Sequence, residues 1–416
     1  RGGENYYGLD VTNRAIPKRL WEIKGGASGT SGFEELGQTW SRPVKTKVKV
    51  GSTVKDALIF SGGYDENQDD VTVRTVDSMG RAIYIVDAAS GALIWSGGYS
   101  SSSYSSDFDE TFADMKYSIP SSIRVIDING DLLADQMYVG DMGGQVWRFD
   151  INNGSAVSAL VDGGVVADLA GNTAASNRRF YHEPDVSIIK DGDTRKLAIA
   201  IGSGWQAHPL NQVVEDRFYM IKDPSWSSKP DDSDNDGALD YTDYTESDLY
   251  DATDNHLGHV SAVNTLAEQV QAHINLGQKH GWYIRLTRSG EKVLAASLTS
   301  RGEVYFTTYE PVPSLVSCSS AAGTPRLFHV HIADATPVKN YDGVGTDTQL
   351  TRPDRERVLK TTSIPTTPQI IRTPEPPADS DTGGPTTITD KLCIGTECGE
   401  LDRTETLTRT YWLEEE

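Results

Sequence analysis

The sequence predicts an all-β protein built as a radial array of sheets, a β-propeller with long inserted loops and one short helix. Three observations support this fold class. Helical periodicity is almost absent, short strands rich in aromatic and β-branched residues follow one another along the chain, and one phrase of strand, polar turn and tryptophan recurs. With 416 residues, 37% of them apolar, and with 39 glycines and 18 prolines, the chain has enough material for a packed core and many turns.

Short strands are expected wherever an apolar run is bounded by glycine, proline or acidic residues. They fall at 57–60, 82–86, 136–139, 145–149, 196–201, 218–221, 293–296 and 303–308. One helix is expected over 261–276, SAVNTLAEQVQAHINL, because its apolar residues are spaced by three and four.

The recurring phrase reads YYGLDVTNRAIPKRLWEI, IYIVDAASGALIWS, VWRFDINNGSAV, FYMIKDPSWS and, more weakly, LFHVHIADATPV. The first four copies lie about 60 to 80 residues apart, longer than a compact propeller blade, so loops must take the additional length. A radial array fits because each repeat can bury its faces only against its neighbours. A β-sandwich made of hairpin repeats is the alternative.

We interpret residues 1–416 as a single propeller domain. From about 354 to 400 the composition shifts to Pro, Thr and Asp, and TPEPPADSDTGGP is expected to be an exposed loop. Residues 401–416 are expected to form a strand that closes the ring. Because the chain opens at Arg1 without an initiator methionine, we expect a fragment or processed product whose export signal lay upstream.

The charge balance excludes some partners. Lys and Arg number 38 against 60 Asp and Glu, a net charge of -22, which repels nucleic acid and anionic lipid and favours cations. No apolar run of roughly 18 residues is present, so membrane insertion is not expected. Of three cysteines, Cys393 and Cys398 could close a small loop in an oxidising compartment, which leaves Cys318 without a partner in this chain.

Two rows of oxygen-bearing side chains predict calcium sites. Calcium takes six to eight hard oxygens, and one loop can supply them from positions one, three, five, seven through its carbonyl, and nine. In DINGDLLAD these positions hold Asp127, Asn129, Asp131, Leu133 and Asp135. Position six, usually glycine, is Leu132, and position twelve is Tyr138 rather than glutamate, so water or another residue would complete the shell.

The second row, DSDNDGALD, fills the same positions with Asp232, Asp234, Asp236, the Ala238 carbonyl and Asp240. Here Gly237 stands at position six. Carboxylates brought together without a cation would repel one another, so the ion is expected to be structural, or regulatory if its affinity is moderate. A solvated acidic turn is the alternative at both rows.

The sequence resembles the C-terminal propeller domain of the PilY family, the calcium-binding proteins at the tips of type IV pili. The resemblance is carried by these phrases: YYGLDVTNRAIPKRLWEI (6–23), IFSGGYDENQDD (59–70), IYIVDAASGALIWSGG (83–98), DMKYSIPSSIRVIDINGDLLADQMYVGDMGGQVWRFDINNG (114–154), RRFYHEPDV (178–186), LAIAIGSGWQAHPLNQVVEDRFYMIKDP (197–224), TESDLYDAT (245–253) and EVYFTTYEP (303–311). They keep the family's order across roughly three quarters of the chain.

The resemblance implies a modified seven-bladed propeller with one calcium loop, at Asp127 to Asp135. It further implies a protein exported to the cell surface at the pilus tip, with minor pilins and a target or host surface as partners. Calcium occupancy would then adjust pilus extension against retraction, and so twitching motility and adhesion. An N-terminal region absent from this chain would precede the domain, and the row from Asp232 to Asp240 looks like an insertion relative to the family.

Two other functions stay open. Repeats such as VDAASGALIW also look like those of quinoprotein dehydrogenases, which hold pyrroloquinoline quinone and calcium, although the chain lacks an adjacent cysteine pair. The G-x-S-x-G, P-loop, H-E-x-x-H and Rossmann patterns are also missing, which favours a non-enzymatic protein. The third possibility is a propeller scaffold that calcium only stiffens.

Overall fold

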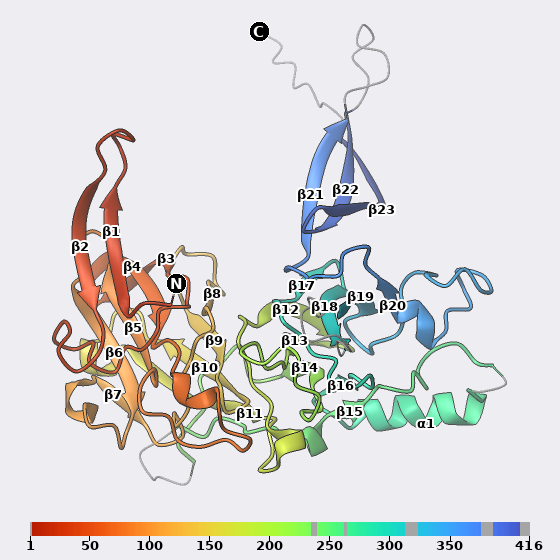
Figure 1. Cartoon of the computed structure of the whole chain (residues 1–416), viewed down its shortest axis with the longest axis horizontal. Helices are drawn as coiled ribbons and strands as arrows, with labels where there is room; N and C mark the ends of the chain where they lie inside the picture. The colour runs from red at the N-terminus through yellow and green to blue at the C-terminus, as the bar shows by residue number, and fades with distance from the viewer. Residues whose placement is uncertain (1, 234–238, 262–263, 313–322, 376–385, 408–416) are drawn as a thin grey trace, which may run out of the picture.

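The structure is a computed structural model that describes residues 2–233, 239–261, 264–312, 323–375 and 386–407, and it is almost entirely β. Six sheets follow one another in chain order. In Figure 1 the second to fifth sheets lie along the long axis from left to right, whereas the first and the sixth project upward from this row. The all-β class with one short helix is confirmed. The sheets are consistent with propeller blades, and four of them contain four or five strands.

The first two sheets come from residues 5–112. The hairpin that projects at the left of Figure 1 consists of β1 (Asn5–Asp10) and β2 (Lys18–Lys24). The second sheet has the strand order β3-β4-β5-β6-β7, with β3 (Val44–Val50), β4 (Thr53–Ser61), β5 (Ala82–Asp87), β6 (Leu93–Tyr99) and β7 (Glu110–Phe112).

The third and fourth sheets occupy the middle of the row. The third has the order β11-β10-β9-β8, with β8 (Arg124–Ile126), β9 (Gln136–Gly140), β10 (Gln145–Ile151) and β11 (Val161–Asp168). The fourth has the order β12-β13-β14-β16-β15, with β12 (Asp185–Asp191), β13 (Thr194–Gly202), β14 (Arg217–Asp223), β15 (Tyr250–Asp251) and β16 (Gly281–Arg285).

The last two sheets are formed by strands between Leu298 and Leu407. The fifth contains β17 (Leu298–Ser300), β18 (Glu303–Pro311), β19 (Gly323–His331) and β20 (Glu356–Val358). The sixth projects from the body in Figure 1 and contains β21 (Gln369–Glu375), β22 (Thr386–Ile394) and β23 (Glu397–Leu407). Short 3-10 turns lie at Glu66–Gln68, Ser105–Asp107, Val157–Ala159, Ala174–Ser176, Glu246–Asp248 and Arg352–Arg355.

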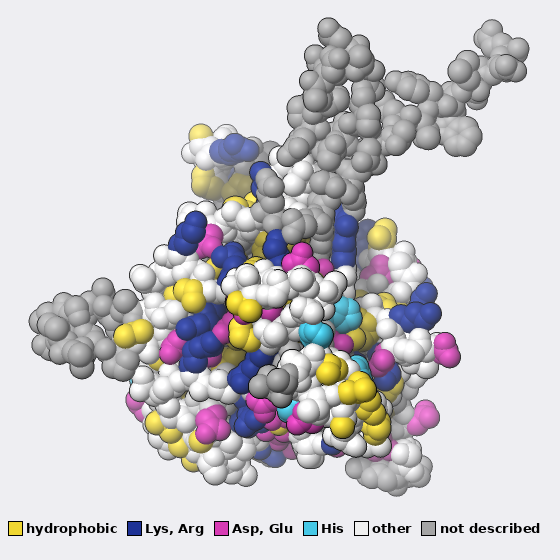
Figure 2. Space-filling view, turned by 90° about the vertical axis from the view of Figure 1, so that its right-hand side faces the viewer, with side chains coloured by type: hydrophobic (Ala, Val, Ile, Leu, Met, Phe, Trp, Pro, Cys, Tyr) yellow, Lys and Arg dark blue, Asp and Glu magenta, His cyan; other side chains and the backbone are white. Residues whose placement is uncertain are grey.

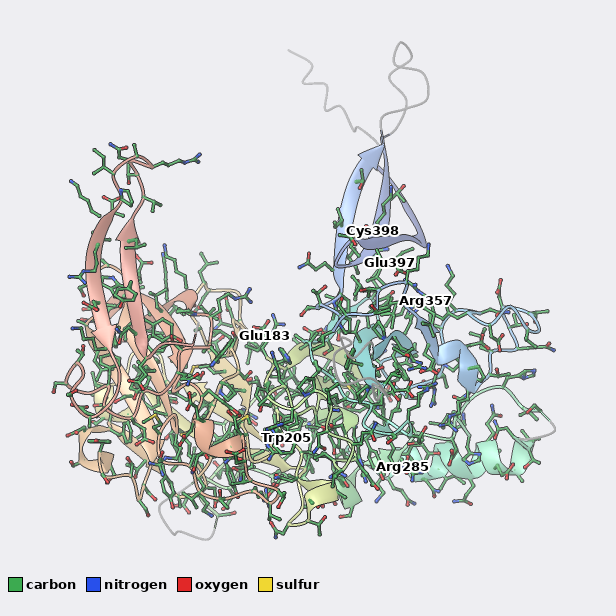
Figure 3. All side chains as sticks on the ribbon, viewed as in Figure 1. Glu183, Trp205, Arg285, Arg357, Glu397 and Cys398 are labelled. Carbon is green, nitrogen blue, oxygen red and sulfur yellow. A yellow bond between two sulfur atoms is a disulfide. The ribbon has the colours of Figure 1, made fainter. Side chains whose placement is uncertain are left out.

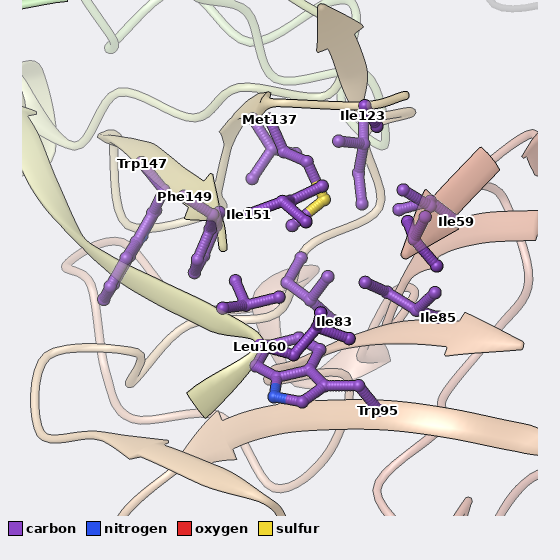
Figure 4. Close-up of a cluster of buried hydrophobic side chains, with 14 of the residues drawn as sticks. Ile59, Ile83, Ile85, Trp95, Ile123, Met137, Trp147, Phe149, Ile151 and Leu160 are labelled. Atoms are coloured by element: carbon purple, nitrogen blue, oxygen red, sulfur yellow. The ribbon is translucent and has the colours of Figure 1, made fainter. Parts of the chain in front are cut away.

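A separate apolar cluster joins each sheet to the next. Trp95, Trp147 and Phe149 fill the space between the second and third sheets, where Trp147 and Phe149 stack at 5.8 Å (Figure 4). Phe218 of the fourth sheet stacks on Phe306 of the fifth at 3.7 Å. Because these five clusters each join adjacent sheets, each sheet depends on its neighbours for burial, as the repeat pattern predicts.

The row is not closed within the described residues, because no strand of the first sheet pairs with a strand of the last. The expected closing segment begins in β23, which pairs with β22, whereas 408–416 lie outside the described residues. Much of the Pro, Thr and Asp-rich region forms β20 to β23, and 376–385 of its expected loop also lie outside. Six consecutive sheets are therefore described where the resemblance implies seven, and two facing sheets of a sandwich are not seen.

Seven of the expected strands are confirmed, and the strand over 293–296 is wrong. That segment is apolar because it is buried against the fourth sheet, where the amide of Val293 donates to the carbonyl of Ser203 at 2.9 Å outside any ladder. The helix α1 (Leu266–Gly277) begins later than expected. Thr265 caps it, because its hydroxyl accepts from the amide of Glu268 while the Glu268 carboxylate accepts from the amide of Thr265.

Replacing Phe306 by alanine is expected to lower the free energy of unfolding by about 3 to 5 kcal/mol, because it removes a fully buried ring that stacks on both Phe218 and Phe328. Ile188→Ala, at a half-exposed site on β12, is the control and should cost roughly 1 kcal/mol or less. Urea unfolding measures both, and similar losses for the two variants would contradict the packing described.

Candidate metal site

The first acidic row forms the exposed loop that connects β8 to β9 (Figure 1). Its side-chain oxygens accept hydrogen bonds from amides of the same loop. The Asp127 carboxylate accepts from the amides of Gly130 at 2.7 Å and Leu132 at 2.8 Å. The side chains of Asn129 and Asp131 each accept from the amide two residues further along, at 2.8 and 2.9 Å. These local bonds hold the backbone of the loop in a tight turn.

Leu132 adopts the left-handed conformation that a calcium loop requires at position six. Its φ is 70°, a value that glycine usually takes, and its side chain points to solvent with 75% of its surface exposed. The departure from glycine noted in the sequence therefore does not prevent the turn. The backbone accepts a conformation that is unfavourable for leucine, which costs about 1 kcal/mol or more.

Asp135 closes the base of the loop. Its carboxylate accepts from the amide of Ile128 at 2.8 Å, and its own amide donates to the carbonyl of Ile126 at 2.9 Å. The Asp135 carbonyl in turn accepts from the amide of Ile151 on β10. Both ends of the loop are therefore held by the third sheet.

The exit of the loop is also bonded to the second sheet. The amide of Ala134 donates to the carbonyl of Lys47 on β3 at 2.9 Å. The Asn153 side chain bridges the two sheets, because its amide nitrogen donates to the Ala134 carbonyl while its oxygen accepts from the amide of Lys49, both at 2.8 Å. The loop thus lies where the second and third sheets meet.

The donor set of this loop suits a hard cation. It offers three carboxylates, the Asn129 amide oxygen and the carbonyl of Leu133, which are the ligand types that calcium prefers. Among the described residues, however, no three Asp, Glu, His or Cys side chains gather around one point. The carboxylates are turned toward backbone amides, so binding an ion would require their side chains to rotate inward.

The second acidic row is described only at its ends. Asp234, Asp236 and Ala238 lie outside the described residues, while Asp232 and Asp240 lie within them. The Asp240 carboxylate accepts from the amide of Ser233 at 2.8 Å and from its hydroxyl, and these bonds hold the pKa of Asp240 below its usual value. The amide of Asp240 also donates to the carbonyl of Asp231 at 3.0 Å, so the two ends of the row lie side by side.

Arg148 supports the base of this second loop, and the sequence reasoning missed it. Its guanidinium is almost fully buried between ion pairs to Asp150 at 2.8 Å and Asp223 at 3.2 Å. It also donates to the carbonyls of Ser225 at 3.2 Å and Ser228 at 2.9 Å, at the start of the loop. An arginine inside the apolar strand phrase VWRFD was the available signal, because a buried arginine requires partners.

A cavity of about 340 Å³ lies between Arg148 and the second acidic loop. Lys229, Asp231, Asp240 and Tyr241 are among the residues that line it. The Tyr241 hydroxyl donates to the Asp150 carboxylate at 2.7 Å, which ties this wall to the Arg148 ion pairs. The cavity therefore has both acidic and basic walls.

Cys393 and Cys398 form a disulfide with an S–S distance of 2.03 Å across directly paired positions of β22 and β23. Next to it, Glu397 accepts from Arg357 at 2.5 Å and joins the sixth sheet to the fifth (Figure 3). Cys318 lies outside the described residues. Within the described ranges, none of the helices combines the length and hydropathy of a membrane span.

Comparison with known proteins identifies relatives in type IV pilus biogenesis, although no family model matches. A protein of Xylella fastidiosa, named a type IV pilus biogenesis factor PilY1 homolog, is 26% identical over 336 residues, which are 77% of this chain and 20% of that protein. Type IV pilus biogenesis factor PilY1 of Pseudomonas aeruginosa PAO1 is 29% identical over 174 residues, 40% of this chain and 12% of that protein. The chain thus spans a fifth or less of the length of these curated relatives.

Among solved structures, the C-terminal domain of Pseudomonas aeruginosa PilY1 matches with a TM-score of 0.58 at 16% identity. The match covers 95% of this chain and 77% of that domain. At this identity the likeness shows a shared fold.

Arg148→Ala is expected to lower the free energy of unfolding by about 3 to 5 kcal/mol, because it leaves Asp150 and Asp223 buried without their cation. The control is Arg19→Ala, which removes an exposed pair with Glu22 and should change stability by less than about 1 kcal/mol. Chemical unfolding of both variants gives the comparison. A loss for Arg148→Ala as small as that of the control would show that the buried pairs do not hold these sheets together.

Proposed function

From the relationship of this chain to the PilY family, whose C-terminal domain it matches, we propose that it is the C-terminal domain of a type IV pilus biogenesis protein that binds calcium and has no enzymatic activity. The observation that carries the proposal is the agreement of two comparisons: a PilY1 homolog matches 77% of the chain in sequence, and a PilY1 C-terminal domain matches 95% of it in fold.

The proposed calcium site is the loop between β8 and β9. Asp127, Asn129 and Asp131 supply side-chain oxygens, and Leu133 and Asp135 complete the set through a carbonyl and a carboxylate. The left-handed conformation of Leu132 supports the assignment, because it gives the loop the turn that this ligand spacing needs. The bound ion would neutralise three carboxylates that otherwise repel one another.

Calcium at this loop would act on the junction between two sheets. Since the loop exit is bonded to Lys47 on β3 and to Asn153, ordering the loop also orders the contact between the second and third sheets. Calcium occupancy of this loop would then change the stability of the domain, and a partner protein that binds the folded domain would respond to that change. At a free calcium concentration one hundred times the dissociation constant, binding would stabilise the fold by about 2.7 kcal/mol.

The second acidic row is proposed as a further calcium site on its ligand types, their spacing and the contact between its two ends. Asp232, Asp234, Asp236, the Ala238 carbonyl and Asp240 have the same spacing as the first row. The hydrogen bond between the backbones of Asp231 and Asp240 brings the two ends of the row together, which supports a loop that could encircle an ion.

At the level of the cell, we propose a surface protein at the pilus tip that supports pilus extension and retraction, twitching motility and adhesion. Minor pilins and a target or host surface are the proposed partners. On the face shown in Figure 2, acidic and basic side chains are interspersed and hydrophobic side chains reach the surface. This mixed surface supports recognition of another protein rather than of a uniformly charged polymer.

Calcium binding is tested by calorimetry on chelator-treated protein. The unmodified chain is expected to bind two ions, Asp131→Ala to lose the first site, and Asp240→Ala to lose the second, because each substitution removes one carboxylate from its row. Asp193→Ala, an exposed aspartate in the turn between β12 and β13, is the matched control and should bind both ions. Absence of binding heat in the unmodified chain would refute the calcium proposal.

The pilus role is tested in cells by replacing the chromosomal gene with one that encodes Asp131→Ala in the full-length protein. Surface piliation and twitching zones are expected to fall relative to an Asp193→Ala strain, because the loop loses its ion while the rest of the domain stays folded. Normal piliation and twitching after complete deletion of the gene would contradict the pilus assignment itself. Normal behaviour of the Asp131→Ala strain alone would contradict only the regulatory role of calcium.

A further inference from the structure

Arg179 is a buried arginine without a carboxylate partner among the described residues. It lies between the third and fourth sheets with 1% of its surface exposed. Its guanidinium donates to the carbonyls of Asn177 at 3.1 Å and Val71 at 2.8 Å, and it lies over the ring of Trp205 at 4.0 Å. Its Nε has no acceptor in the part of the chain that is described. A buried guanidinium without a carboxylate partner is destabilising, so binding of an anion beside it would be favourable.

Three neighbouring side chains carry further polar atoms that are buried and have no partner among the described residues. They are both amide atoms of Asn177, the indole Nε1 of Trp205 and one carboxylate oxygen of Asp216. None of these residues is more than 6% exposed. Buried polar atoms nearly always have hydrogen-bond partners, so several together mark a place that an ion or ordered water would fill. We call these four residues, Asn177, Arg179, Trp205 and Asp216, the Arg179 cluster.

Backbone and side-chain bonds hold the cluster together. The amide of Gly204 donates to the carbonyl of Arg179 at 3.1 Å, which places Trp205 next to the arginine. The Ser203 hydroxyl donates to the other oxygen of Asp216 at 2.7 Å. Figure 3 shows Trp205 near the middle of the row of sheets. The four residues therefore come from three segments that converge where the third and fourth sheets meet.

The surroundings carry excess positive charge. Arg178 and Arg217 share one carboxylate, Glu246, at 3.0 and 2.5 Å. Lys292 is fully buried and donates to the carbonyls of Pro209 and Asn211. With Arg179 these make four cations against three carboxylates, Glu246, Asp216 and Asp77, the last of which acts electrostatically on Arg179. The excess is one positive charge, in a chain whose net charge is -22.

Asp216 limits which anion can enter. Burial raises the pKa of its carboxyl to about 6, while Lys292, Arg178 and Arg179 act to lower it. Its free oxygen and the Asn177 oxygen accept hydrogen bonds, whereas Arg179, Trp205 and the Asn177 nitrogen donate them. A ligand that satisfies the cluster must therefore accept and donate. At neutral pH phosphate carries oxygen acceptors and at least one hydroxyl, whereas sulfate carries no proton to donate.

We propose that the Arg179 cluster binds a protonated oxoanion of the phosphate class, with Arg179, Trp205 and Asn177 donating to its oxygens and Asp216 accepting from its hydroxyl. The site is independent of the proposed calcium loops, which lie on other segments. Because the cluster is buried, inorganic phosphate fits it better than the phosphate end of a larger molecule.

The test uses the complete chain, chelator-treated so that calcium does not contribute, at constant ionic strength. Inorganic phosphate, sulfate and glycerol phosphate are titrated separately, and binding is followed by calorimetry, by Trp fluorescence and by the midpoint of thermal unfolding. Phosphate is expected to raise the midpoint in a saturable manner, sulfate to bind at least about tenfold more weakly, and glycerol phosphate to bind no better than sulfate. Tight binding of glycerol phosphate would identify a monoester as the source of the ligand and support the site while overturning its restriction to inorganic phosphate.

Variants separate the site from general salt effects. Asp216→Asn is expected to reduce the preference for phosphate over sulfate, because the amide can donate to an unprotonated oxygen. Trp205→Phe removes one donor, keeps the ring under Arg179 and should weaken phosphate binding, which provides a readout if Asp216→Asn fails to fold. Asp193→Asn is the exposed control and should bind as the unmodified chain does. Equal responses to phosphate and sulfate, or a crystal grown in phosphate that holds ordered water only, would overturn the proposal.

Discussion

The fold depends on the burial of each sheet against the next one in the chain. No single sheet here could cover both of its faces, and the aromatic clusters at Trp95 and Trp147, and at Phe218 and Phe306, are where that requirement is met. Stability in such a row is the sum of its junctions, so a change at one junction is felt by the two sheets that share it. This explains why the residues with the most distinctive chemistry lie at junctions rather than within one sheet.

Two junctions show this clearly. Between the second and third sheets, the acidic loop is tied to β3 through Ala134 and Lys47, so a cation that orders the loop would also strengthen the packing beneath it. Between the third and fourth sheets, buried charge replaces part of the apolar contact. Arg148 forms ion pairs with Asp150 and Asp223, and Arg179 lies over Trp205 with no carboxylate partner in the described part of the chain. Buried ion pairs add little net stability compared with apolar packing, but they fix which groups can lie opposite one another. Junctions built in this way can respond to ions, which suits a domain proposed to act in a pilus machine.

Much of the fold could be predicted because it is local. The alternation and β-branched residues of segments such as 145–149 specify strands wherever they occur, and Thr265 and Glu268 mark the start of the only α-helix in the described residues. The acidic loop was recognised from its spacing alone, and its left-handed turn formed at Leu132 where glycine was expected. What could not be predicted depends on distant contacts. The segment 293–296 is apolar because it packs against a segment about ninety residues earlier in the chain. Neighbouring residues reveal neither the partners of Arg148 nor the lack of a carboxylate partner for Arg179 among the described residues.

We propose that calcium bound by the loop between β8 and β9 strengthens the packing of the second sheet against the third. Hydrogen exchange of backbone amides, measured with calcium and with chelator, tests it most directly. We expect calcium to slow the exchange of backbone amides in residues 127–135 and in β3. Exchange should also slow at Gly154, whose amide donates to the carbonyl of Lys49 across the same junction. Slowed exchange confined to the loop, or equal exchange in both conditions, would contradict it.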